Sequence, residues 1–124
     1  MVNRQDFINA IDKNIDMVRG DTLAFSFQLG GLESRSAYED LIVTFVVAEH
    51  YDDASLIEIT SGYGIELEDY DTAKDTATFS VTLAPNYTKT LDLNRYYYDL
   101  QIKDTNNVIT LMRGRLTLLW DVAD

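Results

Sequence analysis

The sequence predicts an all-β fold, an antiparallel β-sandwich of seven to nine strands. The first observation is compositional: strand-forming Val, Ile, Thr, Tyr and Phe are abundant, while the chain has one proline and six glycines. The second is that several segments alternate apolar and polar residues, which is the period of a half-buried strand. The third is that residues 91–120 have the pattern of one long β-hairpin.

Length and charge limit the possible functions. The 124 residues suffice for one domain with a single core, and the absence of cysteine excludes disulfides and thiolate chemistry. A formal net charge of -11 disfavours contact with a phosphate backbone, so no nucleic acid partner is expected. The chain has no apolar run long enough to span a membrane and no recognisable signal peptide. We therefore expect a soluble, cytoplasmically made protein without a membrane partner.

Residues 3–15 are the longest helix candidate, because apolar residues recur at helical spacing and Asn3 can cap the first turn. We expect residues 1–14 to form a helical extension to the sandwich. This extension either folds onto its own domain or packs against a neighbouring subunit, and the sequence leaves both alternatives open. The residues at helical spacing are Phe7, Ile8, Ile11 and Ile15.

The next predicted strands cover residues 15–18, 22–29 and 41–48. A turn at residues 19–21 separates the first two; it spells Arg-Gly-Asp, but a glycine turn explains these residues better than an adhesion motif does. Residues 41–48 are apolar on both faces. The second face is expected to be covered by a helix or loop of this chain, with a partner protein as the alternative.

An acidic turn is predicted at residues 69–75. Its carboxylates could hold calcium, but the segment lacks the ligand alternation, the glycine and the closing glutamate of a calcium-binding loop. A solvated turn is therefore the favoured interpretation. The other expected elements are a polar loop at residues 30–40, short strands at 56–60 and 65–68 joined by a turn at 61–64, a core strand at 76–83 and a helical turn at 85–91.

The closing hairpin is expected to organise the domain. Its first strand covers residues 96–103, Asp and Asn residues at 104–107 reverse the chain, and the return strand covers 108–120. Gly114 is expected at a β-bulge that bends this long strand. The residues predicted to face the core are Tyr96, Tyr98, Leu100, Ile102, Leu116, Leu118 and Trp120.

Residues for catalysis or for metal binding are scarce. His50 is the single histidine, and without cysteine no further imidazole or thiolate can complete a zinc site. The sequence contains no G-x-S-x-G elbow, no P-loop and no G-x-G-x-x-G motif, and no pair of carboxylates stands out as an acid and a base. We predict that the protein is not an enzyme and has no catalytic residues, no cofactor and no metal site.

Three stretches occur in an order that resembles a known family. Residues 17–27 read MVRGDTLAFSF, residues 83–88 read LAPNYT, and the closing hairpin contains YYYDLQ at 96–101 and LMRGRLTLLWDV at 111–122. Together they resemble the immunoglobulin-like domain at the N-terminus of baseplate upper proteins, and small prophage-encoded structural proteins, of tailed phages infecting Firmicutes. The resemblance covers most of residues 15–124, and residues 1–14 have no counterpart in it.

The resemblance implies an immunoglobulin-like sandwich over residues 15–124. The pattern Asp92-x-Asn94-x-Tyr96-x-Tyr98 is also similar to the tyrosine corner of such sandwiches. The implied function is a non-enzymatic virion structural protein, a baseplate, tail or head-associated module, made in the bacterial host cytoplasm. Its partners would be other virion proteins or copies of itself, with a homo-oligomer possible. Because the chain stops soon after the closing strand, we expect a free-standing module.

The candidate interface residues combine the apolar positions of the N-terminal extension with aromatic and arginine side chains of the hairpin, since such residues contribute most to interface energies. A carbohydrate-binding or host-surface-binding module, using exposed tyrosines such as Tyr97 or Tyr70 as stacking platforms, is the alternative function. For each candidate a solvated strand face is the competing interpretation. The candidates are Phe7, Ile8, Ile11, Arg95, Tyr97, Arg113 and Arg115.

Overall fold

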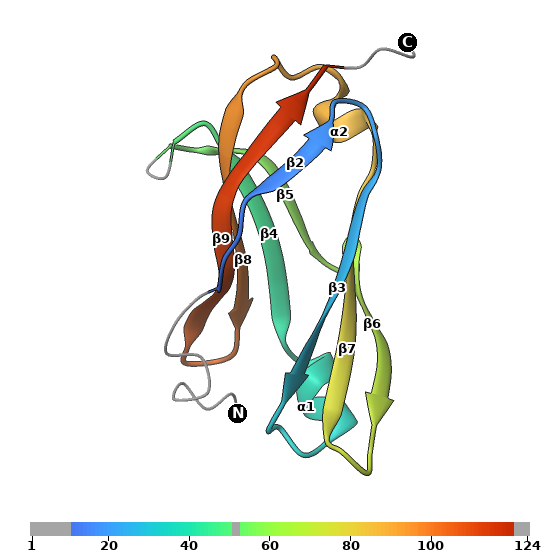
Figure 1. Ribbon diagram of the computed structural model, residues 1–124. Helices are drawn as coiled ribbons and strands as arrows, with labels where there is room; N and C mark the ends of the chain where they lie inside the picture. The colour runs from blue at the N-terminus through green and yellow to red at the C-terminus, as the bar shows by residue number, and fades with distance from the viewer. Residues whose placement is uncertain (1–10, 51–52, 121–124) are drawn as a thin grey trace.

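The computed structural model describes residues 11–50 and 53–120 and confirms the all-β class (Figure 1). Its strands belong to one sheet, and its two helices are short. The elements in chain order are β1 (Ile11–Asp12), β2 (Ile15–Val18), β3 (Leu23–Gly30), α1 (Arg35–Glu39), β4 (Ile42–Ala48), β5 (Ser55–Ser61), β6 (Gly64–Asp71), β7 (Thr76–Leu83), α2 (Asn86–Lys89), β8 (Arg95–Lys103) and β9 (Val108–Leu119).

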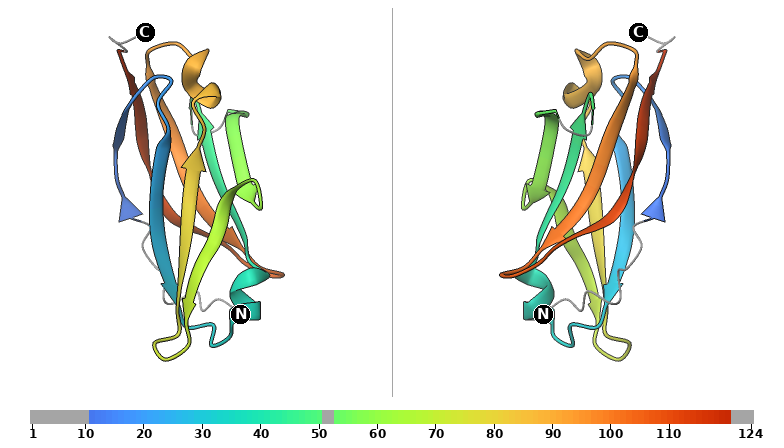
Figure 2. Two further views of the ribbon diagram at one scale, coloured as in Figure 1. Left: turned by 90° about the vertical axis from the view of Figure 1, so that its right-hand side faces the viewer. Right: turned by 90° about the vertical axis from the view of Figure 1, so that its left-hand side faces the viewer.

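The strands follow the order β1-β9-β8-β4-β5-β6-β7-β3, and β2 also pairs with β9. Most neighbours are antiparallel, but β1 and β2 run parallel to β9, and β5 pairs with β6 in parallel over two residue pairs. The predicted antiparallel arrangement therefore holds for most strand pairs but not for these three. The sheet curls until it is nearly closed, so β3 and β7 lie across the interior from β4 and β8 (Figures 1 and 2). The rings of Phe25 in β3 and Phe45 in β4 meet there, with centroids 5.9 Å apart.

The core is formed by every second side chain along the strands, as the two-residue period of a strand predicts. In β4, Val43, Phe45 and Val47 are all fully buried. The second apolar face of β4 is less enclosed, since Ile42 is 49% exposed and Val46 is half-buried. Other fully enclosed side chains are Tyr38, Ile65, Val81, Leu83, Tyr98, Leu100, Ile102 and Leu116.

The predicted closing hairpin is confirmed as β8 and β9. In the turn between them, the Asp104 carboxylate accepts hydrogen bonds from the amides of Asn106 at 2.9 Å and Asn107 at 2.8 Å. The irregularity in the ladder lies opposite Leu100 and Gln101, which pair with Met112 and Thr110. Leu111 is thus the extra residue, and the prediction of a bulge at Gly114 is wrong. Trp120 follows the end of β9 and is 68% exposed, so its predicted place in the core is also wrong.

Gly114 has a different role, because the backbone of Lys13, in the link between β1 and β2, lies directly against it. A Cβ added at Gly114 would overlap the backbone carbonyl of Lys13. The close approach brings two backbone groups within reach of side chains: the Tyr98 hydroxyl donates to the Lys13 carbonyl at 2.5 Å, and Asn14 Oδ1 accepts from the Arg115 amide at 3.0 Å. Glycine here allows the N-terminal strands to pack against the hairpin.

The helix expected over residues 3–15 is not confirmed. Residues 3–10 lie outside the described residues, while Ile11–Asp12 and Ile15–Val18 are strands, so the helix prediction is wrong for residues 11–15. Tertiary pairing explains the difference, because the amides and carbonyls of this segment pair with β9 rather than with each other. In the part of the chain that the structure describes, no helix is long and apolar enough to cross a membrane.

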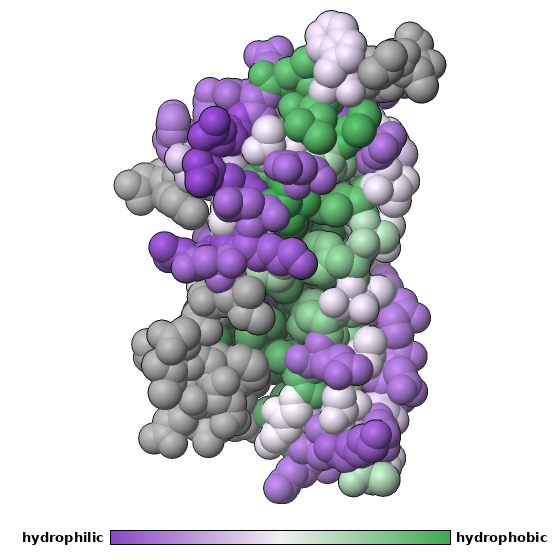
Figure 3. Space-filling model, viewed as in Figure 1, coloured by the Kyte–Doolittle hydropathy of each residue, from purple (hydrophilic) through white to green (hydrophobic). Residues whose placement is uncertain are grey.

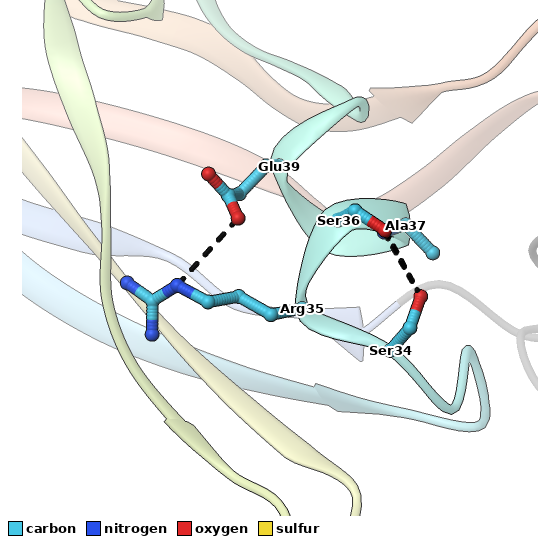
Figure 4. Close-up of polar contacts among 5 residues, drawn as sticks. All are labelled: Ser34, Arg35, Ser36, Ala37 and Glu39. Carbon is cyan, nitrogen blue, oxygen red and sulfur yellow. Dashed lines mark hydrogen bonds and ion pairs between the residues drawn. The ribbon is translucent and has the colours of Figure 1, made fainter.

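Helix α1 lies in the segment that the sequence predicts as a polar loop. Ser34 caps it by accepting a hydrogen bond from the Ala37 amide at 3.2 Å, and Arg35 pairs with Glu39 one turn later at 3.5 Å (Figure 4). The helix is held to the domain by Tyr38, whose side chain is fully buried. The helical turn predicted after Pro85 is present as α2, where Thr88 accepts a hydrogen bond from the Gly20 amide at 2.9 Å.

Candidate interaction surface

The outward side chains of β8 and β9 bring four of the predicted interface residues together. Alternation forces this arrangement, because Tyr96, Tyr98 and Leu100 point inward and their chain neighbours point outward. In the antiparallel register Tyr97 lies opposite Arg115, Asp99 opposite Arg113, and Arg95 opposite Thr117. We call Arg95, Tyr97, Arg113 and Arg115 the arginine face.

The arginines of this face are available at the surface. Arg95, Arg113 and Arg115 are all exposed. Arg113 forms an ion pair with Asp12 of β1 at 3.5 Å, which contributes little to stability because both side chains are more than half exposed. Tyr97 is half-buried, and its ring centroid lies 6.5 Å from that of His50. Guanidinium groups beside a partly exposed aromatic ring can bind carboxylates and planar groups.

Asp99 is the carboxylate at the centre of this face. Burial raises the pKa of Asp99 above its usual value, and the neighbouring Arg113 guanidinium only partly offsets that effect. In the strand register, Asp99 lies between Arg113 of β9 on one side and Val46 of β4 on the other. The face therefore carries one partly buried carboxylate among its exposed guanidinium groups.

The remaining candidates are not brought into this face by what the structure describes. Phe7 and Ile8 lie outside the described residues. Ile11 is in β1, where its backbone pairs with Met112, one residue before Arg113. Of the N-terminal candidates, Ile11 thus belongs to the strand that pairs with β9 beside the arginine face.

A second polar cluster, which the sequence analysis missed, surrounds Asp75 at the end of the β6–β7 turn. One carboxylate oxygen accepts hydrogen bonds from the hydroxyls of Tyr38 at 2.9 Å and Tyr70 at 3.0 Å and from the Glu33 amide at 2.9 Å. The other accepts from the Gly31 amide at 2.9 Å. Partial burial acts to raise the pKa of Asp75, but these hydrogen bonds outweigh it and hold the pKa below its usual value.

This Asp75 cluster is a structural junction. It ties the loop after β3, helix α1, β6 and β7 to one carboxylate, and the tyrosine rings of Tyr38 and Tyr70 pack with centroids 5.3 Å apart. Tyr70 is thereby engaged through its hydroxyl and its ring, so it is not an open stacking platform. Within residues 11–50 and 53–120 no group of three or more His, Asp or Glu side chains is placed to hold a metal ion.

The surface also contains open clefts. One of about 520 Å³ runs between β2 and β3, where the curled sheet does not close, and Leu23, Phe25, Phe27 and Met112 line it. Figure 3 shows hydrophobic residues in this region, between β9 and β3 in the view of Figure 1. Another, of about 530 Å³, lies between α1 and the β8–β9 turn and is lined by Asp40, Lys103 and Asn106 among others.

No protein-family model matches the chain, and no curated protein matches it.

Proposed function

We propose that the chain is an immunoglobulin-like sandwich and a non-enzymatic structural protein of a phage or prophage virion, acting through protein–protein contacts. The strand connectivity supports the fold. The ladders β9-β8-β4-β5 and β3-β7-β6 have the strand order of the two sheets of such a sandwich. The Tyr96 hydroxyl donates to the Asp92 carbonyl at 2.8 Å, four residues upstream, as in a tyrosine corner.

The virion assignment is supported by the three sequence stretches that resemble phage baseplate and prophage structural proteins. They occupy β2 and β3, the β7–α2 junction and the β8–β9 hairpin. Each lies in an element that determines the fold, and the hairpin also carries the arginine face. The protein would sit in a baseplate, in a tail or on a head, in contact with other virion proteins or with copies of itself.

One observation supports the contact function most directly. A chain with a net charge of -11 presents exposed Arg95 and Arg115 beside Tyr97 on a regular sheet surface. Arginine and tyrosine are enriched at the centres of protein interfaces, whereas a surface used only for solubility in so acidic a protein would favour carboxylates. This face is therefore the one expected to bind a partner.

The test uses a bacterial strain that produces the particles and carries a tagged copy of the full chain. Gradient-purified particles are expected to contain the wild-type protein and to lose most of it with Arg95→Ala/Arg115→Ala. Lys74→Ala/Lys89→Ala removes the same charge away from the face and is expected to be retained. The virion assignment fails if the wild-type protein is absent from particles.

The alternative is a carbohydrate-binding or host-surface-binding module. The structure offers Tyr63 and Trp120, 77% and 68% exposed, as stacking platforms, in addition to half-buried Tyr97. A glycan array with the purified protein distinguishes the two functions. Specific glycan binding that is lost with Tyr63→Ala or Tyr97→Ala, together with absence from particles, would favour this alternative.

A further inference from the structure

The surface opposite the arginine face carries carboxylates instead of guanidinium groups. In β6, Ile65 and Leu67 point toward the core, which leaves Glu66 and Glu68 outward. A register shift between Leu67 and Asp69 adds one residue, so that Asp69 is exposed next to Glu68. We call Glu66, Glu68 and Asp69 the acidic face.

We propose that the arginine face of one copy docks on the acidic face of a second copy of this chain, so that molecules assemble head to tail. This inference rests on the proposed contact function and names its partner. Each of the two faces offers what the other lacks, because the exposed arginines would meet exposed carboxylates.

The spacing of the charges supports the match. Arg115 lies opposite Tyr97, two residues from Arg95, and such diagonal neighbours are about 7–8 Å apart. Glu66 and Glu68 are two residues apart along β6, which corresponds to at most about 7 Å because Glu68 is the extra residue of the bulge. Two arginine–carboxylate pairs can therefore form at the same time. Ser80 already donates a hydrogen bond to Glu68 at 2.7 Å, which orients that carboxylate.

The surroundings of the acidic face can accept a sheet surface. Most outward side chains of the neighbouring strands β7 and β3 are small, with Gln28 as the longer exception, so much of this surface loses little side-chain entropy on contact. Ser80 lies beside Glu66 on one side and Ser26 on the other. The small side chains that accompany them are Ala24, Thr78 and Thr82.

The arrangement determines the kind of assembly. The β8–β9 pair and the β6–β7 pair lie on opposite sides of the core (Figure 2). A contact between opposite faces is heterologous, so it propagates into a ring or a filament instead of closing a two-fold dimer. The outer surface of β3, β7 and β6 measures roughly 400 Å², from three strands of about eight residues. This is half of a standard partner surface, so association is expected to be weak and to need high local concentration.

Charge-reversal variants test the inference by sedimentation velocity and light scattering at about 0.15 M salt. Wild type is expected to associate in a concentration-dependent manner beyond the dimer. Arg95→Glu/Arg115→Glu and Glu66→Arg/Glu68→Arg are each expected to weaken association at least about tenfold, because like charges would then face each other. An equimolar mixture of the two variants is expected to assemble again, since each contact between two different variants pairs opposite charges. Lys74→Glu/Lys89→Glu, with the same charge change as the arginine variant, is expected to behave as wild type.

Folding of each variant is checked by circular dichroism and thermal unfolding, and the outcomes separate this inference from the proposed function. A monomeric wild type at high concentration, or a mixture that stays monomeric, overturns the head-to-tail contact. If the arginine variant is then also lost from particles, the face binds a different virion protein and the proposed function stands. If the wild type assembles and the mixture recovers assembly, the inference holds whether or not the protein is found in particles.

Discussion

Replacing Gly114 by alanine is expected to push residues 13 and 14, which link β1 to β2, away from β9. The added methyl group would overlap the carbonyl of Lys13, which is backbone and cannot rotate away. Moving the segment would weaken three hydrogen bonds: from the Lys13 amide to the Arg113 carbonyl at 2.8 Å, from the Arg115 amide to Asn14 at 3.0 Å, and from the Tyr98 hydroxyl to Lys13. At about 1 kcal/mol each, their loss lowers the free energy of unfolding by about 3 kcal/mol.

The assay is urea unfolding at equilibrium, combined with amide hydrogen exchange. The exchange of the Lys13 and Arg115 amides is expected to accelerate in the Gly114→Ala protein, while amides in β4 and β7 keep their relative protection. Thr117→Ala, an outward change in the same strand, is the control and should stay within about 0.5 kcal/mol of wild type. A Gly114→Ala protein of unchanged stability, with Lys13 still protected, would refute the claim that glycine is required for this approach.

Three further predictions concern the titrating and buried polar groups. Asp75→Asn should lower the free energy of unfolding at pH 7, as measured by urea titration. Because folding lowers the pKa of Asp75, the difference in stability between wild type and variant should be full above about pH 4 and should vanish as the pH falls through the folded-state pKa. Asp99→Asn should stabilise the fold at pH 7 and should have the stability of wild type in acid, because burial raises the pKa of Asp99 and disfavours its charged form. A variant that is less stable than wild type at pH 7 would mean that the attraction between Asp99 and Arg113 prevails. Tyr38→Phe removes hydrogen bonds to Asp75 and from the Leu32 amide and should cost about 2 kcal/mol in chemical unfolding, whereas exposed Tyr87→Phe should cost under about 0.5 kcal/mol.

The strands could be predicted from the sequence wherever alternation was strong. The strand predicted at residues 76–83 agrees with β7 at both ends, because every second residue is apolar and those between are Thr or Ser. The hairpin was also predicted, since its turn residues are Asp and Asn. The edge segment at residues 11–15 was mistaken for a helix, because its apolar residues fit a helical period, while its strand structure depends on backbone pairing with a strand about a hundred residues later.

The arginine face was predictable in part for the same reason, since alternation places Arg95 and Tyr97 outward once Tyr96 and Tyr98 point inward. The Asp75 cluster was not predictable, because its donors come from residues 31, 33, 38 and 70 and meet only in the folded chain. The positive φ of 48° at Asp75 fits a turn aspartate, but that local signal does not reveal which donors surround it. The proximity of Lys13 to Gly114 is equally non-local.

The parallel pairing of β2 with β9 also affects how the molecule would respond to mechanical load. Ile15–Val18 and Leu116–Leu119 run in the same direction, so a pull on the entry of β2 and on the exit of β9 acts along the strands. In this shear geometry the hydrogen bonds of the ladder bear the force together, whereas in a peeling geometry they would break one after another. A module joined to its neighbours through these two strands would therefore resist extension until the whole ladder gives way at once.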